Sequence, residues 1–200
     1  MKLVLASRNE HKLSEMRSIL SGFGLEVVSQ ADVGFDLDVE ETGTTFEENS
    51  EIKARALLEA TGMPTIADDS GLMVDALDGA PGVYSHRFGN KNSDEERNDY
   101  LMELMDGIPA ERRGAHYVSV ITCLFPDGRK IVGKGICTGQ ILTEYRGHNG
   151  FGYDPMFLVD GTGKTFAELT AEEKNRISHR AKALADFSAK YQEVFCCDDK

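Results

Sequence analysis

The sequence predicts an α/β protein built on a mixed, elongated and twisted sheet with helices on both of its faces. Over residues 1–75, apolar strand patterns alternate with amphipathic helix patterns, which is typical of a sheet with parallel strands. Two long strand patterns follow at 115–125 and 130–138, and the turn sequence PDG separates them. They predict a β-hairpin, and its antiparallel strands make the sheet mixed. A chain of 200 residues is long enough to form one large domain or two small lobes.

The first half of the chain gives clear boundaries for its helices and strands. Thr45 and Glu48 have the spacing of a capping box, which is typical of a helix start. Gly62 follows the apolar pattern of that helix and predicts its end. Together the patterns predict a strand at 2–6, a helix around 13–20, a strand at 25–29 and a helix at 46–61.

Two consecutive carboxylates, Asp68 and Asp69, are the feature around which the remaining candidates group. They follow the apolar residues 65–67 and precede Ser70-Gly71, so we expect a strand that ends at the pair and then turns. A solvated turn is one interpretation. The other is a functional site at the rim of the sheet, because concentrated negative charge is costly unless it is paired or binds a metal.

Residues 7–12, of sequence SRNEHK, are a candidate phosphate site. They lie between the first strand and the first helix, where free backbone N–H groups and the positive end of the helix dipole favour an anion. Ser7 and Asn9 add side-chain donors, and Arg8 and Lys12 add charge. Ordinary N-capping by Ser7 or Asn9 accounts for the same residues, so this segment alone does not decide between the two interpretations.

The second half of the chain carries a glycine-rich loop and a group of basic residues. The loop at 147–155 has three glycines, which allow a close approach to a ligand, and Phe151 or Tyr153 offers a flat face to a base. Lys174 and His179 lie about 140° apart on one continuous helix. If they act together with Arg180, the helix must break near Ile177.

Composition excludes several classes of protein. The formal net charge of −12 argues against a nucleic-acid polymer as partner, although it allows a small phosphorylated ligand with a cation. No segment has the apolar length of a membrane span. The four cysteines lack metal-site spacing, and free thiols in a chain without a leader point to the cytoplasm. We expect a single catalytic domain at 1–195 and a short tail at 196–200.

Seven sequence blocks occur in order between Ser7 and Arg180, and together they resemble the inosine/xanthosine triphosphate pyrophosphatase family. The blocks are SRNEHK, EETGTTFEENSEIKA, ADDSGL, GAPGVYS, GFGYDP, TFAEL and EKNRISHR. The resemblance implies hydrolysis of nonstandard purine nucleoside triphosphates to the monophosphate and pyrophosphate, with Mg²⁺. It also implies two lobes around a nucleotide-binding cleft and a homodimer. One departure is Ser7-Arg8 where Thr-Gly is common, which leaves open whether Arg8 binds phosphate or points to solvent.

The resemblance also implies roles for individual residues. Asp69, Asp68 and Lys53 are the expected catalytic group, and Glu40, Glu41 and Asp69 the expected metal ligands. The sequence does not decide which aspartate is the base or which glutamate binds the metal. The expected substrate-binding residues are Ser7, Arg8, Asn9, Glu10, His11, Lys12, Ser70, Phe151, Gly152, Tyr153, Asp154, Lys174, His179 and Arg180.

Two other classes of protein share parts of this sequence pattern. A haloacid-dehalogenase-type phosphatase needs Asp-x-Asp, and Ser70 occupies the second position after Asp68, so this class is rejected. A nucleotide-binding regulator without hydrolysis keeps the glycine-rich and basic segments. It has no need of Glu40, Glu41 and Asp69 together.

Overall fold

The structure, a computed structural model, describes residues 1–196 apart from the side chain of Cys196. The expected tail therefore lies outside the described residues, except for Cys196, the last residue of the final helix. The strands are β1 (Lys2–Leu5), β2 (Glu26–Ser29), β3 (Thr65–Val74), β4 (Gly114–Leu124), β5 (Lys130–Ile141) and β6 (Phe157–Val159). The helices are α1 (Glu10–Ser21), α2 (Phe46–Thr61), α3 (Asp94–Leu104), α4 (Ala171–Ile177) and α5 (His179–Cys196).

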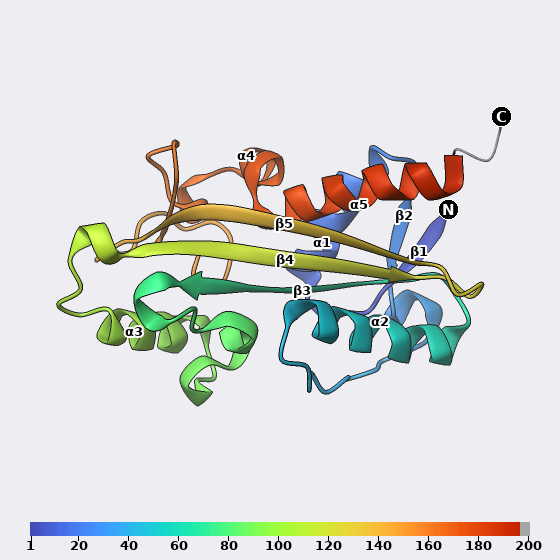
Figure 1. Cartoon of the computed structure of the whole chain (residues 1–200), viewed down its shortest axis with the longest axis horizontal. Helices are drawn as coiled ribbons and strands as arrows, with labels where there is room; N and C mark the ends of the chain where they lie inside the picture. The colour runs from blue at the N-terminus through green and yellow to red at the C-terminus, as the bar shows by residue number, and fades with distance from the viewer. Residues whose placement is uncertain (197–200) are drawn as a thin grey trace. The chain divides into compact units, whose positions relative to one another are not determined.

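The six strands form one mixed sheet in the order β2-β1-β3-β4-β5-β6 (Figure 1). Strand β1 pairs in parallel with β2 and β3, whereas β5 and β6 are antiparallel. Between β4 and β5 the expected tight turn is present, because Phe125 N donates to the carbonyl oxygen of Arg129 at 3.0 Å. The predicted mixed α/β fold is confirmed.

The chain divides into two compact units, each made of separate segments. The first contains residues 1–69, 119–135 and the chain from 180 onward, and the second contains 70–118 and 136–179. The single catalytic domain at 1–195 stays a prediction. No helix within residues 1–196 is both long enough and apolar enough to cross a membrane.

In the first unit, two apolar clusters cover opposite faces of the sheet. Leu5 and Ile66 pack with the buried residues of α1 and α5, such as Met16 and Leu184. On the other face, Val4 and Ala67 pack with Ala54 and Leu57 of α2. Successive side chains on a strand point to opposite faces, so Ile66 and Ala67 mark which side each later β3 residue takes. Figure 1 shows α2 and α5 on the two sides of the strands.

In the second unit, one cluster joins α3 to strand residues and to the glycine-rich segment. Its buried members include Leu72 of β3, Leu101 of α3, Tyr117 of β4 and Phe157 of β6. The helix break predicted near Ile177 is confirmed, because Ser178 has ψ 160° between α4 and α5. This break starts α5 one residue later, at His179.

The start of α2 follows the sequence prediction closely. Thr45 Oγ1 accepts from Glu48 N, and the Glu48 carboxylate accepts in return from Thr45 N. Both bonds satisfy backbone groups that a helix start leaves unpaired. At the other end, Gly62 has φ 66°, a left-handed conformation that glycine adopts without strain. The predicted helix at 46–61 is confirmed at both ends.

Candidate active site

The acidic pair lies within a strand, and the predicted turn after it is wrong. Strand β3 continues from Thr65 through Ser70 and Gly71 to Val74. The turn-forming residues remain extended because β3 continues as a strand beside β4. Strand β1, however, stops at Leu5, which pairs with Ile66. The carboxylates therefore lie just beyond the end of a neighbouring strand, so they still reach the rim of the sheet.

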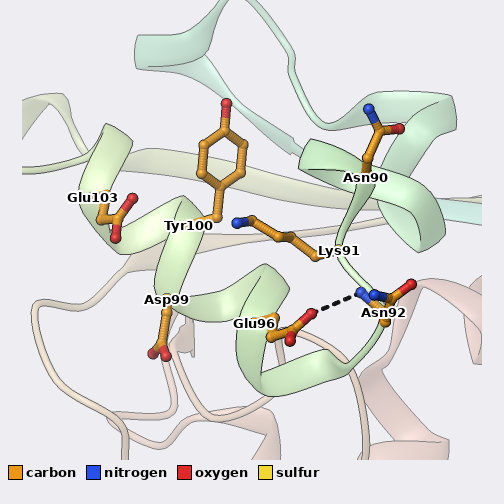
Figure 2. Close-up of a pocket in the computed structure, with 7 residues that line it drawn as sticks. All are labelled: Asn90, Lys91, Asn92, Glu96, Asp99, Tyr100 and Glu103. Atoms are coloured by element: carbon orange, nitrogen blue, oxygen red, sulfur yellow. Dashed lines mark hydrogen bonds between the residues drawn. The ribbon is translucent and has the colours of Figure 1, made fainter.

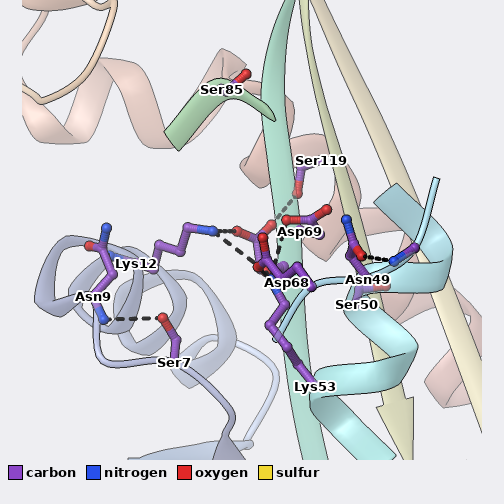
Figure 3. A network of polar contacts seen from close by, with 12 residues as sticks. Ser7, Asn9, Lys12, Asn49, Ser50, Lys53, Asp68, Asp69, Ser85 and Ser119 are labelled. Carbon is purple, nitrogen blue, oxygen red and sulfur yellow. Dashed lines mark hydrogen bonds and ion pairs between the residues drawn. The ribbon is translucent and has the colours of Figure 1, made fainter. Parts of the chain in front are cut away.

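Asp68 is fully buried and tied to three partners. Lys12 Nζ lies 2.8 Å from Asp68 Oδ2, and Ser119 Oγ donates to Oδ1 at 2.6 Å (Figure 3). Arg180 Nη2 lies 3.0 Å from Asp68 Oδ2. Burial by itself raises the pKa of Asp68, but the charges of Arg180 and Lys12 outweigh it and hold the pKa well below its usual value. Asp68 is therefore an ionised anchor for two cations and a poor proton acceptor.

Asp69 points to the opposite face and has one oxygen to spare. Lys53 Nζ lies 3.2 Å from Asp69 Oδ1 and 2.5 Å from Glu41 Oε1, so one ammonium joins two carboxylates. Within residues 1–196, Asp69 Oδ2 is buried and has no hydrogen-bond partner. Burial raises the pKa of Asp69, and the negative charge of Glu41 adds to this, against the opposing effect of Lys53. These properties suit a carboxylate that accepts a proton or binds a cation.

Lys53 is charged despite its burial. Burial alone lowers the pKa of Lys53, but Asp69 and Glu41 more than offset this and raise it. Its Nζ also donates to the backbone oxygen of Asp68 at 2.9 Å. The ammonium is thus fixed on the same face as Asp69 by three oxygen atoms, and α2 supplies it one turn after Asn49.

The acidic loop before α2 is held to that helix by a buried amide. Gly43 N donates to Asn49 Oδ1 at 2.8 Å, and Asn49 is fully buried. A Cβ atom at Gly43 would lie 2.7 Å from the same Oδ1, so the loop needs glycine there.

Glu40 is exposed and Glu41 is half-buried. Within residues 1–196, no three His, Cys, Asp or Glu side chains form a ready metal site.

The phosphate-site candidate divides into residues that face the acidic pair and residues that do not. Asn9 caps α1 by accepting from Lys12 N at 3.1 Å, and Ser7 Oγ accepts from Asn9 N at 3.1 Å. Lys12 reaches Asp68, and burial lowers its pKa. Glu10 and His11 are exposed in the first turn of the helix. The capping and phosphate interpretations both fit this geometry.

Arg8 takes a direction that the sequence did not suggest. Its Nε lies 2.7 Å from Asp36 Oδ1 and its Nη1 lies 3.1 Å from Asp38 Oδ2. Both aspartates are largely exposed, so these ion pairs are weak. The guanidinium thus holds the loop before Glu40 rather than simply pointing to solvent.

The second unit brings the glycine-rich loop and Lys174 together. Lys174 Nζ lies 2.7 Å from Asp154 Oδ2, and both side chains are buried. The same ammonium lies 4.7 Å from the ring centre of Phe151, a cation–π contact. Phe151 N also donates to Asp154 Oδ2 at 3.0 Å. Gly150 makes room for this carboxylate, since a Cβ atom there would lie 2.0 Å from Asp154 Oδ2.

The two aromatic candidates of the loop differ in exposure. Phe151 is half-buried, whereas Tyr153 is 4% exposed and donates its hydroxyl to the backbone oxygen of Ser85 at 2.8 Å. Phe151 is therefore the more exposed of the two rings. Gly152 lies between them with φ 60°. Ser70 is half-buried at the start of the second unit's part of β3.

His179 rests on a residue that sequence reasoning missed. Its ring stacks on Tyr117 with centres 4.6 Å apart and planes 10° apart. Tyr117 is buried on β4, and burial raises the pKa of its hydroxyl far above the usual value. Only the strand pattern at 115–125 marked this position, and no local signal tied it to His179.

Arg180 and Lys174 contact different partners. The Arg180 guanidinium bonds to Asp68 and Glu15 within the first unit, and these carboxylates raise its pKa against the effect of burial. Lys174 bonds to Asp154 within the second. The structure thus brings Arg180 to the acidic pair. A role of Arg180 in reading the base stays a prediction.

A surface pocket on α3 does not suit an anionic ligand. Lys91 and Tyr100 line it beside three carboxylates, with Lys91 Nζ 5.5 Å from the Tyr100 ring centre (Figure 2). The carboxylates are those of Glu96, Asp99 and Glu103. Their excess of negative charge would repel a triphosphate, so we do not assign the substrate to this pocket.

Known proteins resemble this chain over most of its length. The dITP/XTP pyrophosphatase of Thermoanaerobacter sp. (strain X514) is 48% identical over 185 residues, which cover 92% of this chain and 93% of that protein. The dITP/XTP pyrophosphatase of Xanthomonas oryzae pv. oryzae is 50% identical over 191 residues, covering 94% of this chain and 96% of its own.

Solved structures agree with these relatives in fold. A HAM1 protein from Coxiella burnetii has a TM-score of 0.87 and 41% identity, covering 96% of this chain and 99% of its own. The nucleoside-triphosphatase, or dITP/XTP pyrophosphatase, of Mycobacterium abscessus has a TM-score of 0.75 and 46% identity, covering 92% and 97%. The model of the Ham1 family matches residues 3–190, and the chain therefore belongs to the Ham1 family.

Proposed function

We propose that this protein hydrolyses nonstandard purine nucleoside triphosphates, namely ITP, dITP and XTP, to the monophosphate and pyrophosphate. The relatives named dITP/XTP pyrophosphatase support this substrate class. The observation that carries the chemistry is Asp69, a buried carboxylate with a raised pKa and an oxygen without a partner in the described chain. A nucleotide-binding regulator has no need of such a group beside Lys53 and Glu41.

Magnesium is the proposed cofactor, and the residues present fit it. Mg²⁺ binds one or two carboxylates and completes its shell with water and phosphate oxygens. Asp69 and Glu41 supply two carboxylates that already share one cation, the ammonium of Lys53. Glu40 is a further candidate because it precedes Glu41 on the same loop. When bound, the ion would neutralise the charge of the triphosphate and favour attack at phosphorus.

The residues of the chain have separate tasks in this proposal. Asp69 takes a proton from a water molecule, whose oxygen then bonds to the α-phosphorus. The bond from that phosphorus to the α–β bridging oxygen breaks, and pyrophosphate leaves. Lys53 and Lys12 stabilise the negative charge on the phosphoryl oxygens. Asp68 is less suited to be the base, because Lys12, Arg180 and Ser119 occupy its oxygens.

Other residues bind the substrate in this proposal. Ser7, Asn9 and the N-terminus of α1 bind phosphate oxygens in this proposal, which the capping geometry supports. In the second unit, Phe151 provides a flat face for the base, and Lys174 and His179 provide donors. A homodimer and a cytoplasmic location stay predictions.

Isotope labelling tests both the products and the point of attack. The protein is incubated with ITP and Mg²⁺ in water enriched in ¹⁸O, and the products are analysed by mass spectrometry. We expect IMP that carries the label, together with unlabelled pyrophosphate. Label in the pyrophosphate would mean attack at the β-phosphorus, and IDP with orthophosphate as first products would mean attack at the γ-phosphorus. Either result would contradict the proposal, as would binding of ITP without turnover.

A further inference from the structure

Two side chains of helix α3 bond to the backbone of Gly152, one to its N–H and one to its carbonyl oxygen. Gly152 N donates to Asp94 Oδ2 at 2.7 Å, and Asn98 Nδ2 donates to Gly152 O at 3.0 Å. Asp94 and Asn98 are four residues apart, so their side chains lie on one face of the helix. The two peptide groups that flank the Cα atom of Gly152 are thus each bonded, one at its N–H and the other at its carbonyl, by consecutive turns of the same helix.

The side chain of Asp94 is itself held in place by Arg97. The second oxygen of Asp94 pairs with Arg97, which is buried and donates from Nη1 to the backbone oxygen of Lys91 at 3.1 Å. Burial raises the pKa of Asp94, but the Gly152 N–H and Arg97 outweigh it, so the pKa is lowered. Asp94 is therefore an ionised acceptor with a fixed orientation.

Gly152 lies next to Phe151, the residue proposed to contact the purine base. Gly152 directly follows Phe151, whose own N–H is bonded to Asp154 Oδ2 at 3.0 Å. Together these bonds restrain the backbone on both sides of the Phe151 side chain. The backbone next to Phe151 is therefore restrained by α3, a helix in which sequence reasoning found no site residue.

The buried amide of Asn98 is not explained by stability alone. It is 6% exposed, and the bond from Nδ2 to Gly152 fixes the orientation of its amide. Its Oδ1 is then buried without a hydrogen-bond partner in the described part of the chain. An unpaired buried oxygen destabilises a fold, and an apolar side chain of similar size would avoid it. The amide is explained if its donor is needed at Gly152.

We propose that Asn98 and Asp94 are positioning residues that hold Phe151 in place for the purine base. This inference rests on the proposed function and deepens it. Neither side chain needs to touch the substrate. Loss of either bond lets the loop at Gly152 move, which weakens binding of the base and leaves the phosphate chemistry unchanged. In kinetic terms, KM for ITP rises and kcat stays nearly constant.

The test uses Asn98→Leu, with Glu95→Gln as a matched control on the same turn of α3. Glu95 is exposed. We measure kcat and KM for ITP, the Kd for IMP by calorimetry, and the Tm. For Asn98→Leu we expect KM and Kd to rise about tenfold, as for one lost hydrogen bond, with kcat within about twofold. The Tm should not fall, because the unpaired oxygen is removed with the donor. Glu95→Gln should leave all four values unchanged.

A second variant, Asp94→Ala, keeps the inference testable if Asn98→Leu does not fold. It removes the other bond to Gly152 and should raise KM and Kd in the same way. In the double variant the increase should be smaller than the product of the single increases, since both bonds restrain the backbone of the same residue, Gly152. Unchanged KM and Kd in folded Asn98→Leu and Asp94→Ala would overturn the inference, and so would a lower Tm with unchanged KM.

The outcomes also separate this inference from the proposed function. A wild-type protein that binds IMP more tightly than Asn98→Leu but releases no pyrophosphate from ITP would support the positioning role and overturn the hydrolase. A wild-type protein that hydrolyses ITP with the same KM as both variants would support the hydrolase and overturn the positioning role. Absence of IMP binding and of turnover in the wild type would overturn both.

Discussion

Replacing Asp69 with asparagine removes the charge of the proposed base and almost none of its volume. Asparagine keeps an oxygen that faces Lys53, which is 3.2 Å from Asp69 Oδ1 in the wild type. Glu41 remains as the second partner of Lys53, at 2.5 Å. The substitution therefore leaves the ammonium paired while it removes the proton acceptor.

The expected loss of turnover follows from the role of a general base. Such a group contributes about 10²–10⁴-fold, which corresponds to about 3–5 kcal/mol in the activation free energy. Because Asp69 is proposed to act in the chemical step, the loss should appear in kcat. If Asp69 also binds the metal, the Mg²⁺ concentration needed for half-maximal activity should rise too.

Asp69→Asn should lower turnover without lowering the stability of the fold. The folded-state pKa of Asp69 is raised, so the folded protein binds more protons than the unfolded chain as the pH rises past the usual value of 3.8. Stability therefore falls as the pH rises through that interval, and the ionised carboxylate destabilises the fold at neutral pH. Asparagine removes this effect, so the Tm of Asp69→Asn should equal or exceed that of the wild type.

The assay combines pyrophosphate release from ITP with thermal unfolding at pH 7. Magnesium is varied, and circular dichroism confirms that the variant is folded. Turnover within about threefold of the wild type at saturating Mg²⁺ would remove Asp69 from the mechanism. A Tm well below that of the wild type would contradict the conclusion that the ionised Asp69 carboxylate destabilises the fold at neutral pH.

The remaining predictions concern the neighbouring aspartate and the base. Asp68→Asn should lower the free energy of unfolding by about 3–5 kcal/mol, because Arg180 and Lys12 would lose a buried partner. Since the pKa of Asp68 is lowered, its contribution is complete above about pH 3.8 and disappears as the pH falls through the folded-state pKa, which pH-dependent melting of both proteins would reveal. ITP should be preferred over ATP, by up to about 10⁴-fold in kcat/KM, because the Lys174 ammonium carries only donors and pairs with a 6-oxo group but not a 6-amino group. Equal kcat/KM for ITP and ATP would refute the role of Lys174 in recognising the base.

Where a local rule was sufficient, the sequence predicted the fold correctly. Thr45 and Glu48 define the start of α2 through bonds within four residues, and Gly62 ends it through its own backbone conformation. The break between α4 and α5 was expected only if Lys174, His179 and Arg180 act together, because Lys174 and His179 lie about 140° apart on one continuous helix. The structure has the break at Ser178. The hairpin of β4 and β5 was likewise marked by its own turn.

Where the decisive contacts were distant in sequence, prediction from sequence was wrong or incomplete. A turn at Ser70-Gly71 is the local preference, but β3 stays extended because β4 pairs with it from far along the chain. Tyr117 was missed because its stacking partner is His179. The direction of Arg8 depended on Asp36 and Asp38, which local patterns do not connect to it.

The extended backbone at the acidic pair has a chemical consequence. In a turn, two adjacent carboxylates would share one environment, and each would raise the pKa of the other. In a strand they point to opposite faces, so Asp68 meets Lys12 and Arg180 while Asp69 meets Lys53 and Glu41. Asp68 has a lowered pKa and holds two cations, whereas Asp69 has a raised pKa and, within residues 1–196, an oxygen without a hydrogen-bond partner. The strand, by separating two identical neighbours, allows one of them to hold the site together and the other to react.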